Sequence, residues 1–241
     1  MFYNISIRNV IKTSIKINFQ KRDVIKMCGR FVIDDTDDIM DMRRIFETLK
    51  KNYSDTVEFQ NVKKGEIFPS DTVPVIIPKK EDYLDAVPMQ WGIKGYNGTL
   101  VINARSEGVY QKKMFNDSIV NKRCIIPSNG FFEWGVSQNN QSVQTKKEKY
   151  LIKPINTPML YFAGIYEKLP DPADREKELV RFVIMTKEAR GLIRSLHSRM
   201  PVAIERKDIL KWLNGNKNDI NEFFTDPNAP EYSFTNLGKV G

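Results

Sequence analysis

Apolar residues recur along the chain at two periods, and each period predicts a different kind of element. Ile39, Met42, Ile45, Phe46 and Leu49 share one face at helical spacing, so they predict an amphipathic helix. The acidic run 34–38 precedes this helix, and negative charge suits a helix N-terminus. The polar stretch 51–66 that follows predicts a loop.

Short apolar runs bounded by turn residues predict strands. They lie at 30–33, 73–77, 85–91, 99–104, 124–127, 131–134, 150–153, 159–166 and 179–186. The turn Ser128-Asn129-Gly130 predicts that two of these runs form a hairpin. Short helices are expected within 106–121 and at 187–196, 207–213 and 219–224. Because the helices do not alternate one per strand, the pattern predicts an α+β fold that is predominantly antiparallel β, with short peripheral helices.

The length of 241 residues suits one domain, which we expect to span residues 27–241. Residues 1–26 are interpreted as an extension, either a misassigned start or a removable leader, against the alternative of a genuine strand or arm. This extension holds six basic residues and one acid, so it supplies +5 of the net charge of +8. The remaining +3 is no argument for nucleic-acid binding.

The cysteine and histidine counts limit the possible chemistry. Cys28 and Cys124 cannot make a disulfide framework, so a reducing compartment such as the cytoplasm is expected. His197 is the single histidine, and with two cysteines it argues against a Cys/His zinc site. We therefore expect neither a metal nor a cofactor. No apolar run approaches the roughly 20 residues of a membrane span, and Cys124 reads as a core residue.

The segment Met27-Cys28-Gly29-Arg30-Phe31 holds the most specific candidate chemistry. If Met27 is the functional start and is removed, Cys28 carries both a thiol and a free α-amine. An α-amine has a pKa of roughly 7.7–8.0, so part of it is nucleophilic near neutral pH. A 1,2-aminothiol attacks an aldehyde through nitrogen, and its sulfur then closes a thiazolidine ring. As the sequence is written, residues 1–26 block that amine.

Three further polar positions lie in apolar surroundings, each with two open interpretations. Glu133 is either half of a structural ion pair or an acid/base group with a raised pKa. His197 is either a capping or core histidine, or a catalytic one. Asn103 and Arg105 share a face of a strand. They are either an ordinary solvent-facing pair, or a pair that orients a small group and holds a phosphate.

These clusters resemble the SRAP family of abasic-site processing proteins. Five segments match in the family's order, from Met27 to about Val202. They are Met27-Cys28-Gly29-Arg30-Phe31, Ile102-Asn103-Ala104-Arg105-Ser106-Glu107, Phe131-Phe132-Glu133-Trp134, Phe162-Ala163-Gly164-Ile165-Tyr166 and His197-Ser198-Arg199-Met200-Pro201-Val202. Each segment alone is a modest signal, and five in order are a strong one.

The resemblance implies a barrel-like, mainly β fold with a cleft for single-stranded DNA. Cys28 would form a thiazolidine crosslink with the aldehyde of an abasic site, after self-processing at Met27–Cys28, and a lyase side reaction could accompany it. Glu133 and His197 would carry protons, and Asn103 would position the reacting groups. The implied DNA-binding residues are Arg30, Arg105, Trp91, Trp134 and Arg199. The expected partner is single-stranded DNA with abasic sites, bound by a monomer.

The chain also departs from the family pattern. Glu66-Ile67-Phe68-Pro69 keeps only the proline of the family's Asn-x-x-Pro turn, and no proline follows Trp91-Gly92. Two other functional classes stay open: an amide hydrolase that uses Cys28 and His197, and a non-catalytic module that binds single-stranded DNA.

Overall fold

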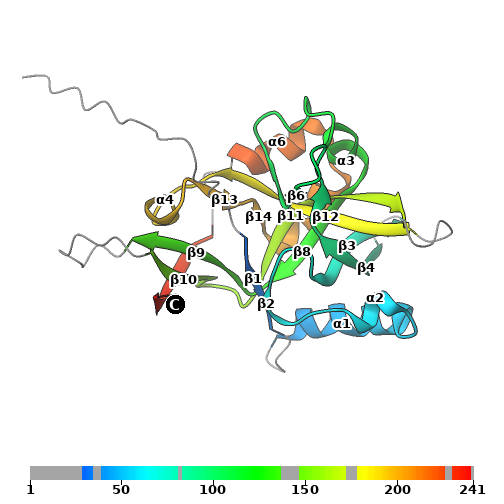
Figure 1. Cartoon of the computed structure of the whole chain (residues 1–241), viewed down its shortest axis with the longest axis horizontal. Helices are drawn as coiled ribbons and strands as arrows, with labels where there is room; N and C mark the ends of the chain where they lie inside the picture. Colours follow the sequence, from blue (N-terminus) through cyan, green and yellow to red (C-terminus); the bar gives the residue numbers. More distant parts are fainter. Residues whose placement is uncertain are drawn as a thin grey trace, which may run out of the picture.

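The computed structural model describes residues 29–34, 39–80, 83–136, 147–171, 178–225 and 230–239. Two β-sheets dominate it, with short helices around them (Figure 1). Its strands are β1 (Phe31–Ile33), β2 (Gly65–Ile67), β3 (Thr72–Lys80), β4 (Tyr83–Trp91), β5 (Ile93–Lys94), β6 (Leu100–Val101), β7 (Asn103–Arg105), β8 (Arg123–Ser128), β9 (Gly130–Val136), β10 (Lys147–Pro154), β11 (Leu160–Pro170), β12 (Glu178–Glu188), β13 (Arg199–Pro201), β14 (Ala203–Ile204) and β15 (Tyr232–Lys239).

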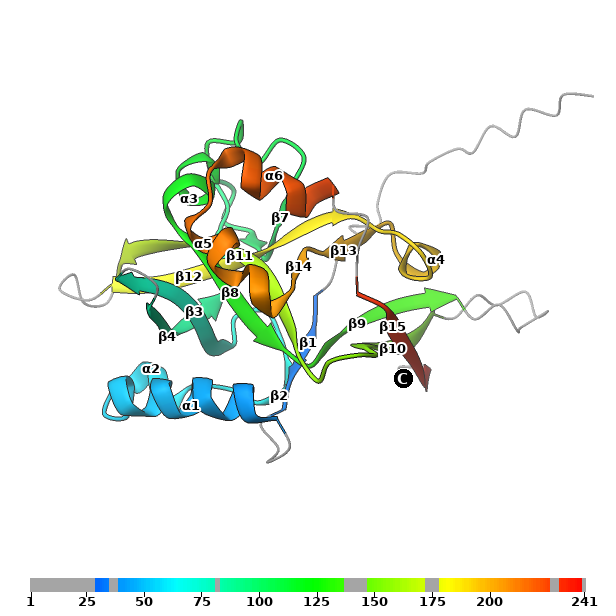
Figure 2. The ribbon, with the colours of Figure 1, turned by 180° about the vertical axis from the view of Figure 1, so that it is seen from behind.

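The helices lie at the periphery, as expected. They are α1 (Met40–Tyr53), α2 (Val57–Gln60), α3 (Asn116–Asn121), α4 (Ile193–Leu196), the 3-10 turn η1 (Arg206–Asp208), α5 (Ile209–Asn214) and α6 (Lys217–Thr225). Figures 1 and 2 place α1 and α2 along one side of the barrel strands and α3 and α6 on the opposite side. The α+β class, predominantly antiparallel, is confirmed.

The larger sheet closes on itself as a barrel. β12 pairs antiparallel with β11 and parallel with β4, while β3 joins β4 to β8 and β8 joins β11, so the ring is β12-β4-β3-β8-β11. Closure removes the free edges of these five strands. The C-terminal end of β12 continues beyond the barrel, where β7 pairs with it at Ile184–Thr186 and β13 at Thr186–Glu188.

The smaller sheet has the order β15-β10-β9-β1-β2, and every pairing in it is antiparallel. It packs on the barrel through aromatic side chains. The Phe31 ring meets Trp91 at a centroid distance of 5.0 Å and Phe162 at 6.1 Å, both edge-on. Offset and edge-on ring pairs add to the hydrophobic contribution of burial, so these contacts fix the sheets against each other.

Three local expectations are wrong. The stretch 51–66 is not a loop, because α1 continues to Tyr53 and α2 follows it. The expected helix at 187–196 is reduced to α4, since the ladder to β13 keeps residues up to Glu188 in β12.

The runs 124–127 and 131–134 form no hairpin, because β8 joins the barrel and β9 the smaller sheet. Tertiary hydrogen bonds hold the corner between them: the Asn129 N–H donates to the Val32 carbonyl at 2.9 Å, and its side chain donates to the Pro158 carbonyl at 3.1 Å.

Candidate functional site

His197 follows α4 directly, and α4 packs on β9. A Cβ built on Gly135 would clash with Leu196 Cδ2 unless the leucine side chain moved, so the glycine favours this close approach. Because side chains two apart on a strand share a face, Leu196 lies on the face of β9 that also carries Glu133. The packing therefore brings the His197 loop, which leads into β13 of the larger sheet, to the Glu133 face of the smaller sheet.

The His197 imidazole has a defined arrangement. Nδ1 lies 3.0 Å from the Arg199 backbone nitrogen and 3.2 Å from the Arg199 carbonyl oxygen, so it can accept from the N–H or donate to the carbonyl, depending on the tautomer. Nε2 is buried and has no hydrogen-bond partner among the described residues. Burial lowers the pKa of His197, and the hydrogen bond to the Arg199 backbone only partly opposes this. The imidazole is therefore neutral at pH 7 and free to exchange a proton through Nε2.

Glu133 is 2% exposed, which is exceptional for a carboxylate. The β1–β9 register pairs Phe31 with Phe131, and the Phe132 N–H donates to the Arg30 carbonyl at 2.9 Å. Continuing this register by one more residue puts Gly29 opposite Glu133. Cys28, Gly29's neighbour in the sequence, lies outside the described residues.

Asn103 and Arg105 lie on β7 and therefore beside the end of β12. They are in register with Ile184 and Thr186, on the edge of β12 that pairs with β4 earlier in the strand. Arg105 is exposed and forms no ion pair within the part of the chain that the structure describes. Its guanidinium is therefore available to an anion.

Arg199 is more constrained than expected for a phosphate ligand. Its guanidinium donates to both Glu107 oxygens, at 2.8 and 2.7 Å, and to the Thr186 carbonyl at 2.8 Å. The hydrogen bonds from Arg199 lower the pKa of Glu107, which keeps this carboxylate ionised. This bidentate ion pair connects the loop that follows β7 with strand β13. It also fixes the position of the Arg199 backbone, which contacts His197.

Of the predicted site residues, Arg105, His197 and Arg199 share an open cleft of about 700 Å³, while Asn103 and Glu133 are not among its lining residues. The cleft is lined by Arg105, Glu107, Lys112, Glu188, Arg194, Leu196, His197, Ser198 and Arg199. Four of these residues are cationic and two are acidic, so the cleft favours an anion. Lys112 and Arg194 were missed in the sequence, because no local pattern separates them from ordinary surface cations.

The two predicted stacking tryptophans have different surroundings. Trp91 is 0% exposed, its ring is stacked parallel to Phe182, and its Nε1 donates to the Ile102 carbonyl at 2.9 Å. The Trp91 ring is therefore part of the core and presents no exposed face to DNA. Trp134 is only partly buried, with the Arg30 guanidinium 5.4 Å from its centroid. Cys124 is a buried core cysteine, as expected, and burial raises its pKa well above the ordinary value.

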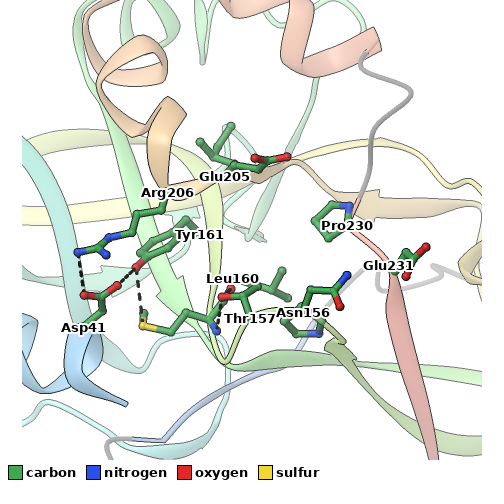
Figure 3. Close-up of a pocket in the computed structure, with 12 residues that line it drawn as sticks. Asp41, Asn156, Thr157, Leu160, Tyr161, Glu205, Arg206, Pro230 and Glu231 are labelled. Carbon is green, nitrogen blue, oxygen red and sulfur yellow. Dashed lines mark hydrogen bonds and ion pairs between the residues drawn. The ribbon is translucent and has the colours of Figure 1, made fainter. Parts of the chain in front are cut away.

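A second cavity of about 370 Å³ contains none of the predicted site residues (Figure 3). Asp41 accepts a hydrogen bond there from the Tyr161 hydroxyl at 3.1 Å and forms an ion pair with Arg206 at 2.9 Å. Glu205 and Glu231 also line it. With three carboxylates to one guanidinium, this cavity does not suit a phosphate chain.

A family model described as SOS response associated peptidase (SRAP) matches residues 27–238. The chain belongs to the SRAP family. Among relatives of this SRAP protein, the abasic site processing protein YoqW of Bacillus subtilis is 28% identical over 200 residues, which cover 80% of this chain and 83% of YoqW. The abasic site processing protein YedK of Escherichia coli is 24% identical over 191 residues, covering 78% of this chain and 79% of YedK.

Solved structures agree on the fold of this SRAP protein. A Bacteroides thetaiotaomicron protein superposes with a TM-score of 0.57 at 26% identity, covering 70% of this chain and 77% of the other. A Bordetella bronchiseptica protein reaches 0.65 at 16% identity, covering 87% and 99%, a likeness that concerns the fold alone.

Two further observations limit the site. Within the described ranges, no helix is long and apolar enough to cross a membrane. In the same ranges, no group of three or more His, Cys, Asp or Glu side chains could hold a metal ion.

Proposed function

We propose that this SRAP protein processes abasic sites in DNA through a covalent adduct of Cys28. The observation that carries the proposal is the β1–β9 register, which puts the residue next to Cys28 opposite the buried Glu133. Relatives named abasic site processing proteins, which align over most of their length, support the same substrate. The cationic cleft beside His197 suits the phosphates that flank such a site.

The proposed reaction begins with the ring-opened sugar, whose C1′ is an aldehyde. The Cys28 amine adds to C1′ to give a carbinolamine, which loses water to form a Schiff base. The Cys28 thiolate then adds to the same carbon, and a proton passes to the nitrogen as the thiazolidine closes. One water leaves overall. A Schiff base beside the 3′ phosphate also permits β-elimination, which is the lyase side reaction.

Glu133 and His197 have complementary properties for these proton transfers. Neutral His197 can take a proton from the amine or thiol, and Glu133 can deliver one to the departing water. Asn103 would position the Cys28 amine or the opened sugar, and Arg105 would hold a flanking phosphate. The same acid/base pair could assist water in cleaving Met27–Cys28, which would free the amine by self-processing.

Intact mass measured on two forms of the protein tests this proposal. One form starts at Met1 and the other at Met27 with its methionine removed, and each is mixed with single-stranded DNA that contains one abasic site. We expect a denaturation-resistant adduct from the mature Cys28 form. The form that keeps residues 1–26 should give none, because its nitrogen there is an amide. No adduct from a verified Cys28 N-terminus contradicts the proposal and favours the amide hydrolase.

The acid/base roles predict a pH dependence. Protonation of the Cys28 amine should slow adduct formation as the pH falls below roughly 7.7–8.0. Because burial lowers the pKa of His197, its protonation should add a second, steeper fall only below the ordinary histidine value of about 6.5. We expect Glu133→Gln and His197→Ala each to slow adduct formation about 100-fold. His197→Ala should also remove the second fall and leave that of the amine. Both variants should still bind undamaged single strands, and normal rates in both would exclude this acid/base assignment.

A further inference from the structure

The cavity of Figure 3, which we call the acidic cavity, is lined by residues from both sheets. Its walls come from the start of α1, the loop that joins β10 to β11, the segment after β14 and the residues just before β15. Figure 3 shows Asp41 and Glu231 at opposite ends of the cavity, with Glu205 between them. The wall also includes the apolar residues Met159, Leu160, Ile204 and Pro230. The cavity thus combines negative charge with apolar surface.

Asp41 is fixed by its neighbours. One of its oxygens accepts from the Tyr161 hydroxyl at 3.1 Å, and the other pairs with Arg206 at 2.9 Å. Burial and, after it, the charge of Asp41 raise the pKa of Tyr161, so the hydroxyl stays protonated and continues to donate. This end of the cavity is therefore preorganised, and Arg206 balances the charge of Asp41.

The other two carboxylates can receive a cation. Glu231 is exposed, and its side chain has no hydrogen-bond or ion-pair partner within the part of the chain that the structure describes. Its backbone is fixed, because its carbonyl accepts from the Ile155 N–H at 3.0 Å. Glu205 pairs with Lys207 at 2.8 Å, but both side chains are more than half exposed. Such a pair stabilises little and is readily exchanged for another.

A second cavity of about 420 Å³, which we call the apolar groove, continues from the acidic cavity. The two share Pro230 and Glu231. The groove runs between the start of β15 and the segment that enters α4, and its apolar residues are Ile155, Leu192, Ile193, Met200, Tyr232 and Phe234. Leu192 is 69% exposed and Ile155 is 57% exposed. Contiguous exposed apolar side chains mark interaction sites, and an elongated ligand can occupy the groove and the acidic cavity together.

We propose that the acidic cavity and the apolar groove bind a peptide segment of a partner protein, in which an arginine or lysine adjoins apolar side chains. The cationic head group reaches Glu205 and Glu231, and its methylene stem lies on the apolar wall. The neighbouring apolar side chains cover the groove, which a free small cation would leave exposed. Charge complementarity excludes an acidic segment, because Arg190, the cation that lines the groove, already donates to the Thr225 carbonyl at 3.3 Å.

This proposed interaction goes beyond the chemistry of abasic sites. Neither the acidic cavity nor the apolar groove contains a predicted site residue, and neither shares a lining residue with the cationic cleft beside His197. Glu231→Gln should therefore form abasic adducts normally, so the peptide site and the Cys28 chemistry succeed or fail independently.

Selection from a phage library of random heptapeptides tests the proposal. The target is the full chain, and a variant that combines Glu205→Gln, Glu231→Gln and Leu192→Ser serves for counter-selection. We expect the enriched peptides to carry an arginine or lysine beside leucine, isoleucine, valine or phenylalanine. Enrichment of acidic peptides, or of no peptide, overturns the proposal.

Fluorescence anisotropy with one labelled, enriched peptide then measures each contribution. Combining Glu205→Gln with Glu231→Gln should weaken binding about 5- to 10-fold, as expected for two exposed ion pairs, and should reduce the salt dependence. Leu192→Ser should weaken binding about 10-fold and leave the salt dependence unchanged, because it removes only apolar burial.

Matched variants on α2 control for the loss of exposed side chains in general. Glu58→Gln and Val57→Ser change residues that are also exposed but lie outside both cavities, and each should bind like the parent protein. Unchanged affinity in the double glutamate variant or in Leu192→Ser contradicts the proposal. Equally tight binding of N-acetylarginine methylamide alone would show a site for small cations and would also overturn it.

Discussion

Replacing Cys28 by serine is expected to abolish the denaturation-resistant adduct while binding to undamaged single strands persists. Serine keeps the α-amine, so a Schiff base can still form, but a hydroxyl is a far weaker nucleophile than a thiolate for ring closure. Borohydride should therefore trap an adduct from mature Cys28→Ser protein, and none should survive denaturation without it. The measurement is the intact mass of the protein after it is mixed with abasic DNA, with and without borohydride.

Cys124→Ala is the matched control, because it removes the other thiol. Cys124 is 0% exposed and its pKa is raised by burial, so it is a poor nucleophile and the variant should form adducts normally. A stable adduct from Cys28→Ser, or its loss in Cys124→Ala with the fold intact, contradicts the assignment of the nucleophile.

Replacing Arg123 by alanine is expected to cost about 3–5 kcal/mol of unfolding free energy, because several backbone acceptors lose a charged donor. Its guanidinium donates to two carbonyls at the end of α3, Ile119 and Val120, at 2.8 and 2.9 Å. It also donates to the carbonyls of Trp212, Leu213 and Gly215 at the end of α5, at 2.7 to 3.0 Å. One side chain thus satisfies carbonyl groups at the C-termini of two helices.

Urea unfolding followed by circular dichroism measures this cost, with Arg44→Ala as the control. Arg44 is exposed on α1, and its removal should change the unfolding free energy by about 0.5 kcal/mol or less. Arg123→Lys should recover only part of the stability, because a single ammonium group cannot donate to all the carbonyls that the planar guanidinium reaches. Equal stability of the Arg123→Ala and Arg44→Ala variants would refute the capping role.

Local periodicity predicted the elements well where one face is buried against a neighbour. Met42 and Leu49 are buried on α1, as their spacing required. The runs at 73–77 and 85–91 lie within strands β3 and β4, and the run at 159–166 coincides with β11 from Leu160 onward. The predicted hairpin at 128–130 does not form. The two flanking runs are apolar, so their sequences are compatible both with pairing to each other and with pairing to strands of different sheets. Bonds from Asn129 to Val32 and Pro158, far away in the sequence, decide between them.

Most predicted site residues could be named from local motifs, but their surroundings could not. Trp91 and Trp134 look alike in the sequence, and only the packing between the two sheets makes Trp91 core and leaves Trp134 partly exposed. Arg199 likewise reads as a free cation until Glu107, 92 residues earlier, takes up its guanidinium.

The sequence alone therefore determined the α+β class, because this follows from short-range periodicity. Residue types in short motifs likewise gave the resemblance to the SRAP family and the candidates Cys28, Glu133 and His197. The tertiary structure decided the rest. It closed the barrel, placed the His197 loop on the Glu133 face through Gly135, and set Phe68 beside Arg30 and Trp134. Each of these depends on strand pairing and side-chain packing between distant segments, which no local pattern encodes.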